Sequence, residues 1–358
     1  MGDAADTTME HLKRMAAANN AKCGRALPAE PEPTPPLKCV AVFGASGAQG
    51  GAVVAALCDW GEVDVVAVTR KPDSDKARAL AAHARVRVAQ ADMDDPASLG
   101  PALAGCDGVF LVTNFWEHLD EAREERQATA VLDACKAAGV ARVVFSTLED
   151  VAAIQADGGL GFIFGKIPPL ASGQIVPHFD GKGRAMAHAK TLGLNCVFLK
   201  MSFYMENFST YMPPVKNDDG TFSIQLPMGP GTGLQMGIVS VRDVGGVAKA
   251  FFADPDAYPG WELGCAGDVL DMDEIAEAFA EVFGKEVSYR PVELEVYKGL
   301  GFPGAAELGN MFRFYQDAGR CVRSAADTRG MFPGAQTLKA WLEANKDHPK
   351  WKEIGLVE

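Results

Sequence analysis

A glycine-rich turn between an apolar strand and a helix is the feature that most constrains how this chain can fold. The apolar run Cys39-Val40-Ala41-Val42 leads directly into Phe43-Gly44-Ala45-Ser46-Gly47-Ala48-Gln49-Gly50-Gly51. At this spacing the first glycine allows a sharp turn, the second lets the backbone approach a pyrophosphate, and the third lets the next helix, expected over residues 49–59, pack on the sheet. The N–H groups at the start of such a helix suit phosphate oxygens. Any tight strand-to-helix turn can use glycines, so the interpretation depends on the rest of the chain.

Strands and helical segments alternate after this turn. Further strands are expected at residues 63–69, 86–91, 108–113 and 142–146, with helical stretches between them, such as 120–138. This alternation indicates right-handed crossovers between parallel strands. The predicted fold class is therefore α/β, with a doubly wound parallel sheet of the Rossmann type.

The residues that follow these strands fit a dinucleotide with a 2′-phosphate. Arg70 and Lys71 end the second strand, where an NAD site usually carries an acid, so NADP(H) is favoured over NAD(H). The two cations could also be solvated turn residues. Asp92, after the third strand, suits the adenine amino group or, alternatively, caps the helix that starts near Pro96. The predicted cofactor-binding residues at these turns are Gly44, Ser46, Gly47, Ala48, Gln49, Gly50, Arg70, Lys71, Asp92, Met93, Thr113, Asn114 and Phe115.

Composition argues against several classes of protein. The 358 residues carry a formal net charge of −13 and no cluster of Lys or Arg, which argues against direct nucleic-acid binding. No apolar stretch has the length of a membrane-spanning helix, so no membrane association is expected. The eight cysteines include no CxxC pair and the six histidines form no HExxH motif, so no metal site is expected. Scattered thiols are typical of a reducing compartment, which predicts a cytoplasmic protein, with the nucleus or an organelle left open by the N-terminal extension.

His178 and Lys182 stand four residues apart, and this spacing resembles the YxxxK active site of the short-chain dehydrogenase/reductase superfamily. In that superfamily the tyrosine is the general acid, while the lysine lowers the pKa of the tyrosine and binds the nicotinamide ribose. A histidine in the tyrosine's place donates a proton only when protonated, a state that the cationic Lys182 disfavours. The predicted catalytic residues are thus His178, with proton transfer left open, and Lys182, which is also expected to bind the cofactor. Both could instead be structural, as helix-start packing and a surface cation.

Further segments together resemble the NmrA-like family of atypical short-chain dehydrogenases/reductases, and within it the HSCARG-type redox sensors. They are residues 44–51, 112–117, 145–149, 178–182, 203–208, 311–315 and 337–342. The resemblance spans residues 38 to about 345 and implies a Rossmann domain with a smaller C-terminal α/β lobe that closes a cleft over the nicotinamide end of NADP(H). It also implies two kinds of activity. Members without the tyrosine sense the NADPH/NADP ratio and bind protein partners, whereas relatives reduce quinones or other small carbonyl compounds.

The predicted organisation has four parts. They are a disordered, Pro-rich extension (1–37), an NADP-binding Rossmann domain (38–200, with 236–262 returning to it), a smaller lobe (201–235 and 263–345) and a tail (346–358). In the second lobe, the Met- and aromatic-rich run 201–214 either lines a hydrophobic substrate cleft or forms core. A helix is expected over 242–253, and Asp271 is expected to cap another that ends near Phe283.

Two functions fit these residues. The loss of the tyrosine favours an NADP(H)-binding redox sensor or regulatory protein with little or no turnover, acting through a protein partner. The alternative is an NADPH-dependent oxidoreductase that reduces a quinone or another hydrophobic carbonyl compound by direct hydride transfer, with solvent supplying protons. The sequence leaves the substrate, the protein partner and a homodimeric state undetermined.

Overall fold

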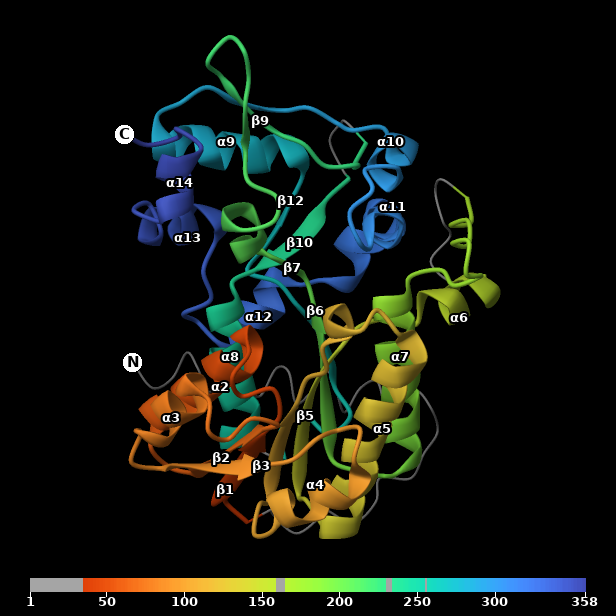
Figure 1. Cartoon of the computed structure of the whole chain (residues 1–358), viewed down its shortest axis with the longest axis vertical. Helices are drawn as coiled ribbons and strands as arrows, with labels where there is room; N and C mark the ends of the chain where they lie inside the picture. The colour runs from red at the N-terminus through yellow and green to blue at the C-terminus, as the bar shows by residue number, and fades with distance from the viewer. Residues whose placement is uncertain (1–34, 159–164, 230–233, 255) are drawn as a thin grey trace.

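A seven-stranded parallel sheet forms the centre of the structure (Figure 1). The computed structural model describes residues 35–158, 165–229, 234–254 and 256–358, so almost all of the predicted N-terminal extension lies outside it. In spatial order the strands are β11 (Glu262–Cys265), β6 (Cys196–Met201), β5 (Arg142–Thr147), β4 (Gly108–Leu111), β1 (Cys39–Val42), β2 (Asp64–Thr69) and β3 (Val86–Gln90). The strand order changes direction at β1, which opens a crevice at the carboxyl edge where such sheets bind ligands. The predicted doubly wound sheet is confirmed.

Helices cover both faces of this sheet (Figure 1). They are α2 (Ala48–Trp60), α3 (Asp75–Ala81), α4 (Pro96–Leu103), α5 (Glu121–Ala138), α6 (Val151–Ala156), α7 (Pro177–Thr191) and α8 (Val241–Ala253). Val40 and Val42 of β1 join the hydrophobic core that includes α2 and α8. Ala41 and Phe43 point to the opposite face and join the core that includes α4, α5 and α7. Because both faces are buried, the strands are continuous apolar runs in the sequence.

The N-cap of the helix after β3 is an aspartate. Asp95 is the N-cap of α4, and its side chain accepts a hydrogen bond from the N–H of Ala97. The alternative that Asp92 caps this helix is therefore wrong. The Asp92 carboxylate lies three residues too early and accepts from the N–H of Asp94 at 3.0 Å instead.

The remaining elements lie beyond the carboxyl edge of the sheet, in the upper part of Figure 1, and we call them the cap. They are β7 (Phe203–Tyr204), η2 (Met205–Ser209), β8 (Val215–Lys216), β9 (Phe222–Ile224), β10 (Met236–Val239), β12 (Asp268–Leu270), α9 (Met272–Phe283), β13 (Val287–Tyr289), α10 (Leu294–Lys298), α11 (Ala305–Val322), α12 (Ala325–Met331), α13 (Leu338–Ala344) and α14 (Pro349–Glu353). The strands form two small sheets, β12-β10-β7 and β13-β9-β8. Asp271 and Glu274 form a reciprocal capping box at the start of α9, which confirms the predicted cap residue.

The last residues of the chain pack into the cap. Trp351 of α14 is fully buried, and its indole N–H donates to the carbonyl of Asn345 at 2.8 Å. Its ring lies 5.8 Å from that of Phe279 and 5.5 Å from that of Phe283, both in α9. Residues 346–358, predicted to be a tail, therefore contribute to the hydrophobic core of the cap.

A buried ion pair joins the cap to the sheet. Arg323, which follows α11, donates from Nη1 and Nη2 to the two carboxylate oxygens of Glu149 at 2.6 and 3.0 Å. It also donates to the carbonyl of Met201, at the end of β6. Burial raises the pKa of Glu149, but the charge and hydrogen bonds of Arg323 outweigh burial and hold that pKa below its usual value. Removing one partner of such a pair leaves the other charge buried and uncompensated.

Within the described ranges, no helix is both long enough and apolar enough to cross a membrane. The same part of the chain contains no group of three or more His, Cys, Asp or Glu side chains placed to hold a metal ion.

Candidate functional site

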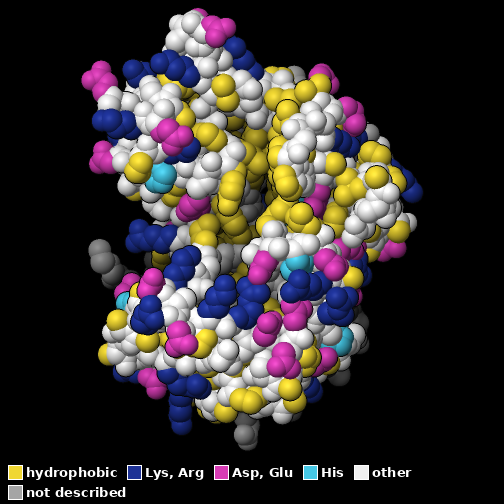
Figure 2. Space-filling view, in the orientation of Figure 1, with side chains coloured by type: hydrophobic (Ala, Val, Ile, Leu, Met, Phe, Trp, Pro, Cys, Tyr) yellow, Lys and Arg dark blue, Asp and Glu magenta, His cyan; other side chains and the backbone are white. Residues whose placement is uncertain are grey.

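A cavity of about 2020 Å³ lies between the carboxyl edge of the sheet and the cap. Figure 2 shows the cleft, with hydrophobic side chains along its walls and Lys and Arg side chains gathered below it. Every residue that the sequence predicts for a site lines this cavity: Gly44, Ser46, Gly47, Ala48, Gln49, Gly50, Arg70, Lys71, Asp92, Met93, Thr113, Asn114, Phe115, His178 and Lys182. The fold therefore brings the predicted cofactor-binding residues and the predicted catalytic pair to one place.

The glycine turn between β1 and α2 forms one wall of the cavity. Gly44 has a φ of +68°, in the left-handed region that favours glycine. A Cβ on Gly50 would lie 2.2 Å from the carbonyl oxygen of Gly44, so α2 can begin this close to the turn only with glycine there. Gly47 is the N-cap of α2, which has neither a side-chain cap nor an acidic residue in its first turn. The first N–H groups of this helix are therefore available to an anion.

Gln49 adds a polar side chain to this wall. Its amide nitrogen donates to the hydroxyl of Tyr204 in the cap. Its Oε1 is buried and has no hydrogen-bond partner among the described residues. A buried acceptor without a partner is costly unless a bound molecule supplies a donor. The glycine backbone, the free helix N–H groups and this orphaned acceptor together fit a polar, phosphate-bearing ligand such as a dinucleotide.

Cations gather where β2 ends. Arg70 forms an ion pair of 2.7 Å with Glu117, and both side chains are nearly half exposed. Lys71 lines the cavity beside it, together with Lys76 in the first turn of α3. The Nζ of Lys76 lies 3.5 Å from the carbonyl oxygen of Ser46 in the glycine turn. The sequence analysis did not identify Lys76. Because α3 begins so soon after β2, its first turn lies near the carboxyl edge of the sheet, and this could have indicated the lysine.

Strands β3 and β4 end at the same cavity. Asp92 and Met93 follow β3, and Thr113, Asn114 and Phe115 follow β4. Phe115 is buried and begins the short 3-10 helix η1 (Phe115–Glu117). Because the carboxyl ends of parallel strands meet at one edge, consecutive turns supply neighbouring parts of one binding surface.

Lys182 of α7 forms a buried ion pair with Glu124 of α5, and its side chain is 11 % exposed. The hydroxyl of Thr113 donates to the same carboxylate oxygen at 2.8 Å. The other oxygen of Glu124 is buried without a hydrogen-bond partner among the described residues. Sequence reasoning missed Glu124, which stands 58 positions from Lys182 and reaches it only through the packing of α5 on α7.

His178 forms a second buried pair, with Glu307 of α11. Its Nδ1 lies 2.6 Å from Oε1 of Glu307, and its backbone N–H donates to the same oxygen at 2.7 Å. The imidazole ring lies 5.0 Å from the ring of Trp116 and 5.9 Å from that of Phe115. With an ionised Glu307, Nδ1 carries a proton and Nε2 is the nitrogen directed away from the pair. Glu307 stands 129 positions from His178, and no local pattern could have indicated it.

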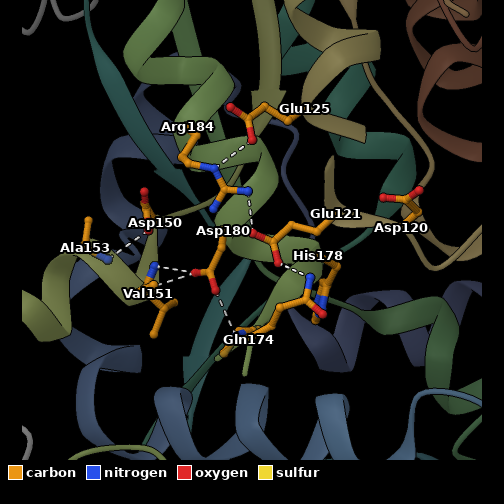
Figure 3. Close-up of polar contacts among 12 residues, drawn as sticks. Asp120, Glu121, Glu125, Asp150, Val151, Ala153, Gln174, His178, Asp180 and Arg184 are labelled. Carbon is orange, nitrogen blue, oxygen red and sulfur yellow. Dashed lines mark hydrogen bonds and ion pairs between the residues drawn. The ribbon is translucent and has the colours of Figure 1, made fainter. Parts of the chain in front are cut away.

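Polar contacts fix the start of α7, which carries both of these residues (Figure 3). One oxygen of Asp180 accepts from the N–H groups of Val151 and Ala152, and the other accepts from the N–H of Val176 at 3.0 Å. Burial raises the pKa of Asp180 to about 6, although these hydrogen bonds oppose the shift. One turn further on, Arg184 binds carboxylates of α5, as Figure 3 shows. The helix is therefore held from both sides, which fixes the position of the imidazole.

The end of the cavity beyond His178 is apolar and aromatic. Its residues come from η1, α7, the strand ends β6 and β7, and the cap: Trp116, Phe179, Met201, Phe203, Tyr204, Met212, Val292, Tyr297, Leu300, Phe302, Leu308, Met311 and Tyr315. The run 201–214 divides between its two predicted roles. Met205 and Phe208 are fully buried in the core, whereas Met201, Phe203 and Tyr204 line the cavity.

Three phenols of this apolar end remain neutral over the physiological range. Burial raises the pKa of Tyr297 to about 12 and raises the pKa values of Tyr204 and Tyr315 further. A neutral phenol can donate a hydrogen bond to a substrate oxygen but is a weak acid.

Comparison with known proteins identifies the family. The sequence model of the NmrA-like family matches residues 36–342. An NmrA-like family domain-containing oxidoreductase, FrzB, from Cladobotryum sp is 27% identical over 299 residues, covering 78% of this chain and 84% of that protein. An NAD(P)H azoreductase from Xenophilus azovorans is 28% identical over 272 residues, covering 74% of this chain and 82% of that protein.

Solved structures share the fold. NmrA, a negative transcriptional regulator crystallised in complex with NADP, has a TM-score of 0.71 at 18% identity and covers 88% of this chain and 97% of its own. The NADPH-dependent quinone oxidoreductase of Escherichia coli, complexed with NADPH, has a TM-score of 0.63 at 22% identity and covers 86% and 98%. The Rossmann-type architecture is therefore common to a regulator and to a reductase.

Proposed function

This chain belongs to the NmrA-like family, and from that premise we propose that it is an NADP(H)-dependent reductase of a flat, apolar electron acceptor such as a quinone. The observation that carries the proposal is the arrangement of the cavity, in which a phosphate-binding turn opens into an aromatic chamber with a buried His178/Glu307 pair. The names of its relatives support this proposal, since they include several oxidoreductases and an azoreductase.

The residues at the polar end fit NADP(H). The glycine turn and the N-terminus of α2 would hold the pyrophosphate, and Arg70, Lys71 and Lys76 would hold the 2′-phosphate. Lys182 and the unpartnered oxygen of Glu124 would bind hydroxyls of the nicotinamide ribose. When bound, NADPH supplies a hydride, that is, a proton with two electrons.

His178 would deliver the proton that completes the reduction. An acceptor that gains two electrons develops negative charge on an oxygen or nitrogen, and the protonated imidazole can donate to that atom from Nε2. Glu307 holds Nδ1 and so fixes the ring and balances its positive charge. Solvent then returns a proton to the imidazole. Trp116, Tyr297 and Tyr315 offer aromatic surfaces to a planar acceptor.

The ion pairs also explain why we place the reductase ahead of the sensor that the sequence favours. Lys182 disfavours a protonated His178 if its charge is unopposed. In the fold the lysine faces Glu124 and the histidine faces Glu307, so a protonated imidazole would have a carboxylate of its own beside it. A histidine in the tyrosine's place is therefore compatible with acid catalysis here.

A sensor remains the second candidate, and the Arg70–Glu117 ion pair favours it. A 2′-phosphate that bound Arg70 would compete with Glu117, which belongs to η1 next to Trp116. Binding of NADP(H) would then change the segment at the mouth of the cleft, where Trp116 and Leu119 are about half exposed. A protein partner could recognise that change.

One experiment separates the two candidates. Single-turnover oxidation of bound NADPH is followed by absorbance with a panel of quinones, azo dyes and aldehydes. We expect rapid oxidation with at least one planar acceptor. NADPH that binds but is not oxidised by any of them would contradict the reductase. In that case hydrogen exchange at residues 114–119, with and without NADPH, should show the cofactor-dependent change that a sensor requires.

A further inference from the structure

Two cysteines meet at the amino edge of the sheet, opposite the cavity. Cys39 begins β1, and Cys106 lies two residues before the neighbouring strand β4. Their Sγ atoms are 3.4 Å apart. Two hydrogen bonds hold the backbone of Cys39 next to Asp107, the neighbour of Cys106. Asp107 donates its N–H to the carbonyl of Cys39, and its carboxylate accepts from the N–H of Cys39, each at 3.0 Å. A disulfide needs a sulfur separation of about 2.05 Å, so the thiols are within reach of a small side-chain rotation.

The surroundings of Cys39 differ from those of the other described cysteines. Burial raises the pKa values of Cys196 and Cys265 to about 12, which leaves these thiols inert. Cys39 is only partly buried, and its pKa is lowered, first by the hydrogen bond from Cys106 and, against the opposing effect of burial, by the charge of Arg87. The same hydrogen bond and burial raise the pKa of Cys106, so Cys106 holds the proton of the pair. The guanidinium of Arg87 lies 3.9 Å from the sulfur of Cys106. The acids Asp107 and Asp64 act on Cys39 in the opposite direction to Arg87 without reversing the shift in its pKa.

We propose that Cys39 and Cys106 form a reversible dithiol–disulfide site that exchanges with low-molecular-weight disulfides such as glutathione disulfide. This site is separate from the proposed reductase chemistry and does not depend on it. Cys39 is the partly buried, attacking thiol, Cys106 is the buried, resolving thiol, and Arg87 is the cation beside them.

The exchange proceeds in two balanced steps. The Cys39 thiolate attacks one sulfur of glutathione disulfide, forming a mixed disulfide and releasing one glutathione thiolate. Cys106 then loses its proton and attacks the Cys39 sulfur, which forms the protein disulfide and releases the second glutathione. Two protein thiols are thereby oxidised by two electrons, and one glutathione disulfide is reduced to two glutathione thiols. An excess of glutathione reverses both steps.

Oxidation would close a covalent loop that contains β1, α2, β2, α3, β3 and α4. That loop carries Arg70, Lys71 and Lys76 at its opposite end. The oxidised chain should therefore unfold at a higher temperature, because the cross-link limits the unfolded ensemble. The stability of the protein would then depend on the ratio of glutathione to glutathione disulfide, in addition to any dependence on NADP(H).

The test uses the full-length protein equilibrated with defined ratios of glutathione to glutathione disulfide, then acid-quenched, alkylated and analysed by peptide mass spectrometry. Trypsin leaves Cys39 and Cys58 on one peptide, so the assignment is made in a Cys58→Ser background. We expect a Cys39–Cys106 cross-linked peptide that glutathione removes. In Cys106→Ser, Cys39 should instead accumulate as the mixed disulfide with glutathione. Arg87→Gln should slow the reaction of Cys39 several-fold.

Two results would overturn the proposal. One is complete alkylation of Cys39 and Cys106 at oxidising ratios, and the other is failure of Cys39 to form the mixed disulfide in Cys106→Ser. NADPH oxidation by Cys39→Ser and Cys106→Ser is measured in parallel and should match that of the parent protein. The disulfide proposal and the reductase proposal can therefore be tested independently of each other.

Discussion

The two ends of the cavity are built in different ways. At the nucleotide end, the lining residues come from consecutive turns after β1, β2, β3 and β4, and much of the binding surface is backbone. At the aromatic end, the lining side chains come from η1, α7 and several elements of the cap. The first end is fixed by local geometry, whereas the second exists only when the cap is packed on the sheet. Substitutions should therefore act locally at one end and cooperatively at the other.

The strongest test of the local end is Gly50→Val. Its Cβ would lie 2.2 Å from the carbonyl oxygen of Gly44, a backbone atom that cannot move away cheaply, so we expect complete loss of NADPH binding and a lower melting temperature. Gly47→Val should lose affinity with little loss of stability, since its Cβ would lie 3.2 Å from the same oxygen. Gly100→Ala in α4 is the control, because its Cβ would meet nothing within 4 Å. Calorimetric binding of NADPH at wild-type affinity by Gly50→Val would refute the role given to the turn.

Glu149→Gln tests the attachment of the cap. It would leave Arg323 buried without its charge partner, and we expect a loss of about 3–5 kcal/mol in the free energy of unfolding. The control is Glu281→Gln, which removes an exposed ion pair with Lys339 within the cap and should change the free energy of unfolding little. Both values come from urea unfolding. Equal losses in the two variants would show that the ion pair between Arg323 and Glu149 does not attach the cap to the sheet.

His178→Ala and Glu307→Gln test the aromatic end. General acid catalysis is typically worth roughly 10²–10⁴-fold, so we expect His178→Ala to slow NADPH oxidation by a factor in that range. Glu307→Gln keeps an acceptor near Nδ1 but removes the charge, and should give a smaller loss. The NADPH dissociation constant should change little in either variant. A solvent deuterium isotope effect that is the same in the parent and in His178→Ala would exclude proton donation by the imidazole.

The contrast between local geometry at one end and long-range packing at the other also explains which features could be predicted from the sequence. The turn glycines, the apolar strands and Asp271 as the N-cap of α9 are local patterns. The structure has them where the sequence predicts them. The partners of the predicted charges were missed, because Glu124 and Glu307 stand 58 and 129 positions from the residues they bind. The alternative prediction that Asp92 is the N-cap of α4 was wrong because Asp95, the acid immediately before Pro96, has that position.

A smaller effect is expected at the cations of the nucleotide end. Arg70→Gln should weaken NADPH binding about tenfold and leave NADH binding unchanged, since one charge-assisted hydrogen bond contributes roughly 1.5–3 kcal/mol. Glu117→Gln should strengthen NADPH binding slightly, because it frees Arg70 from its ion pair. The control Arg78→Gln changes an exposed arginine of α3 that pairs with Asp75. Equal losses for NADPH and NADH in Arg70→Gln would show that Arg70 does not bind a 2′-phosphate.

The smallest expected effect is a pH dependence at the start of α7. The pKa of Asp180 is raised to about 6 by burial, above its usual value near 3.9, so between these values the folded state keeps a proton that the unfolded state has lost. This group therefore stabilises the fold less as pH rises from about 4 to about 6, and its contribution is level above that. Three backbone N–H groups bind the carboxylate and favour its ionised form, so the shift, and with it the pH dependence, is smaller than burial alone would give.

Asp180→Asn should remove that slope. It should also cost about 1–3 kcal/mol at every pH, because the amide has a single accepting oxygen and its NH₂ group only donates, so at least one of the three backbone N–H groups loses its acceptor. The free energy of unfolding of the parent minus that of the variant should then fall across the window and stay constant above pH 6. A constant difference from pH 4 to pH 7 would show that Asp180 is ionised throughout. An ionised carboxylate would then hold the start of α7 across that whole range.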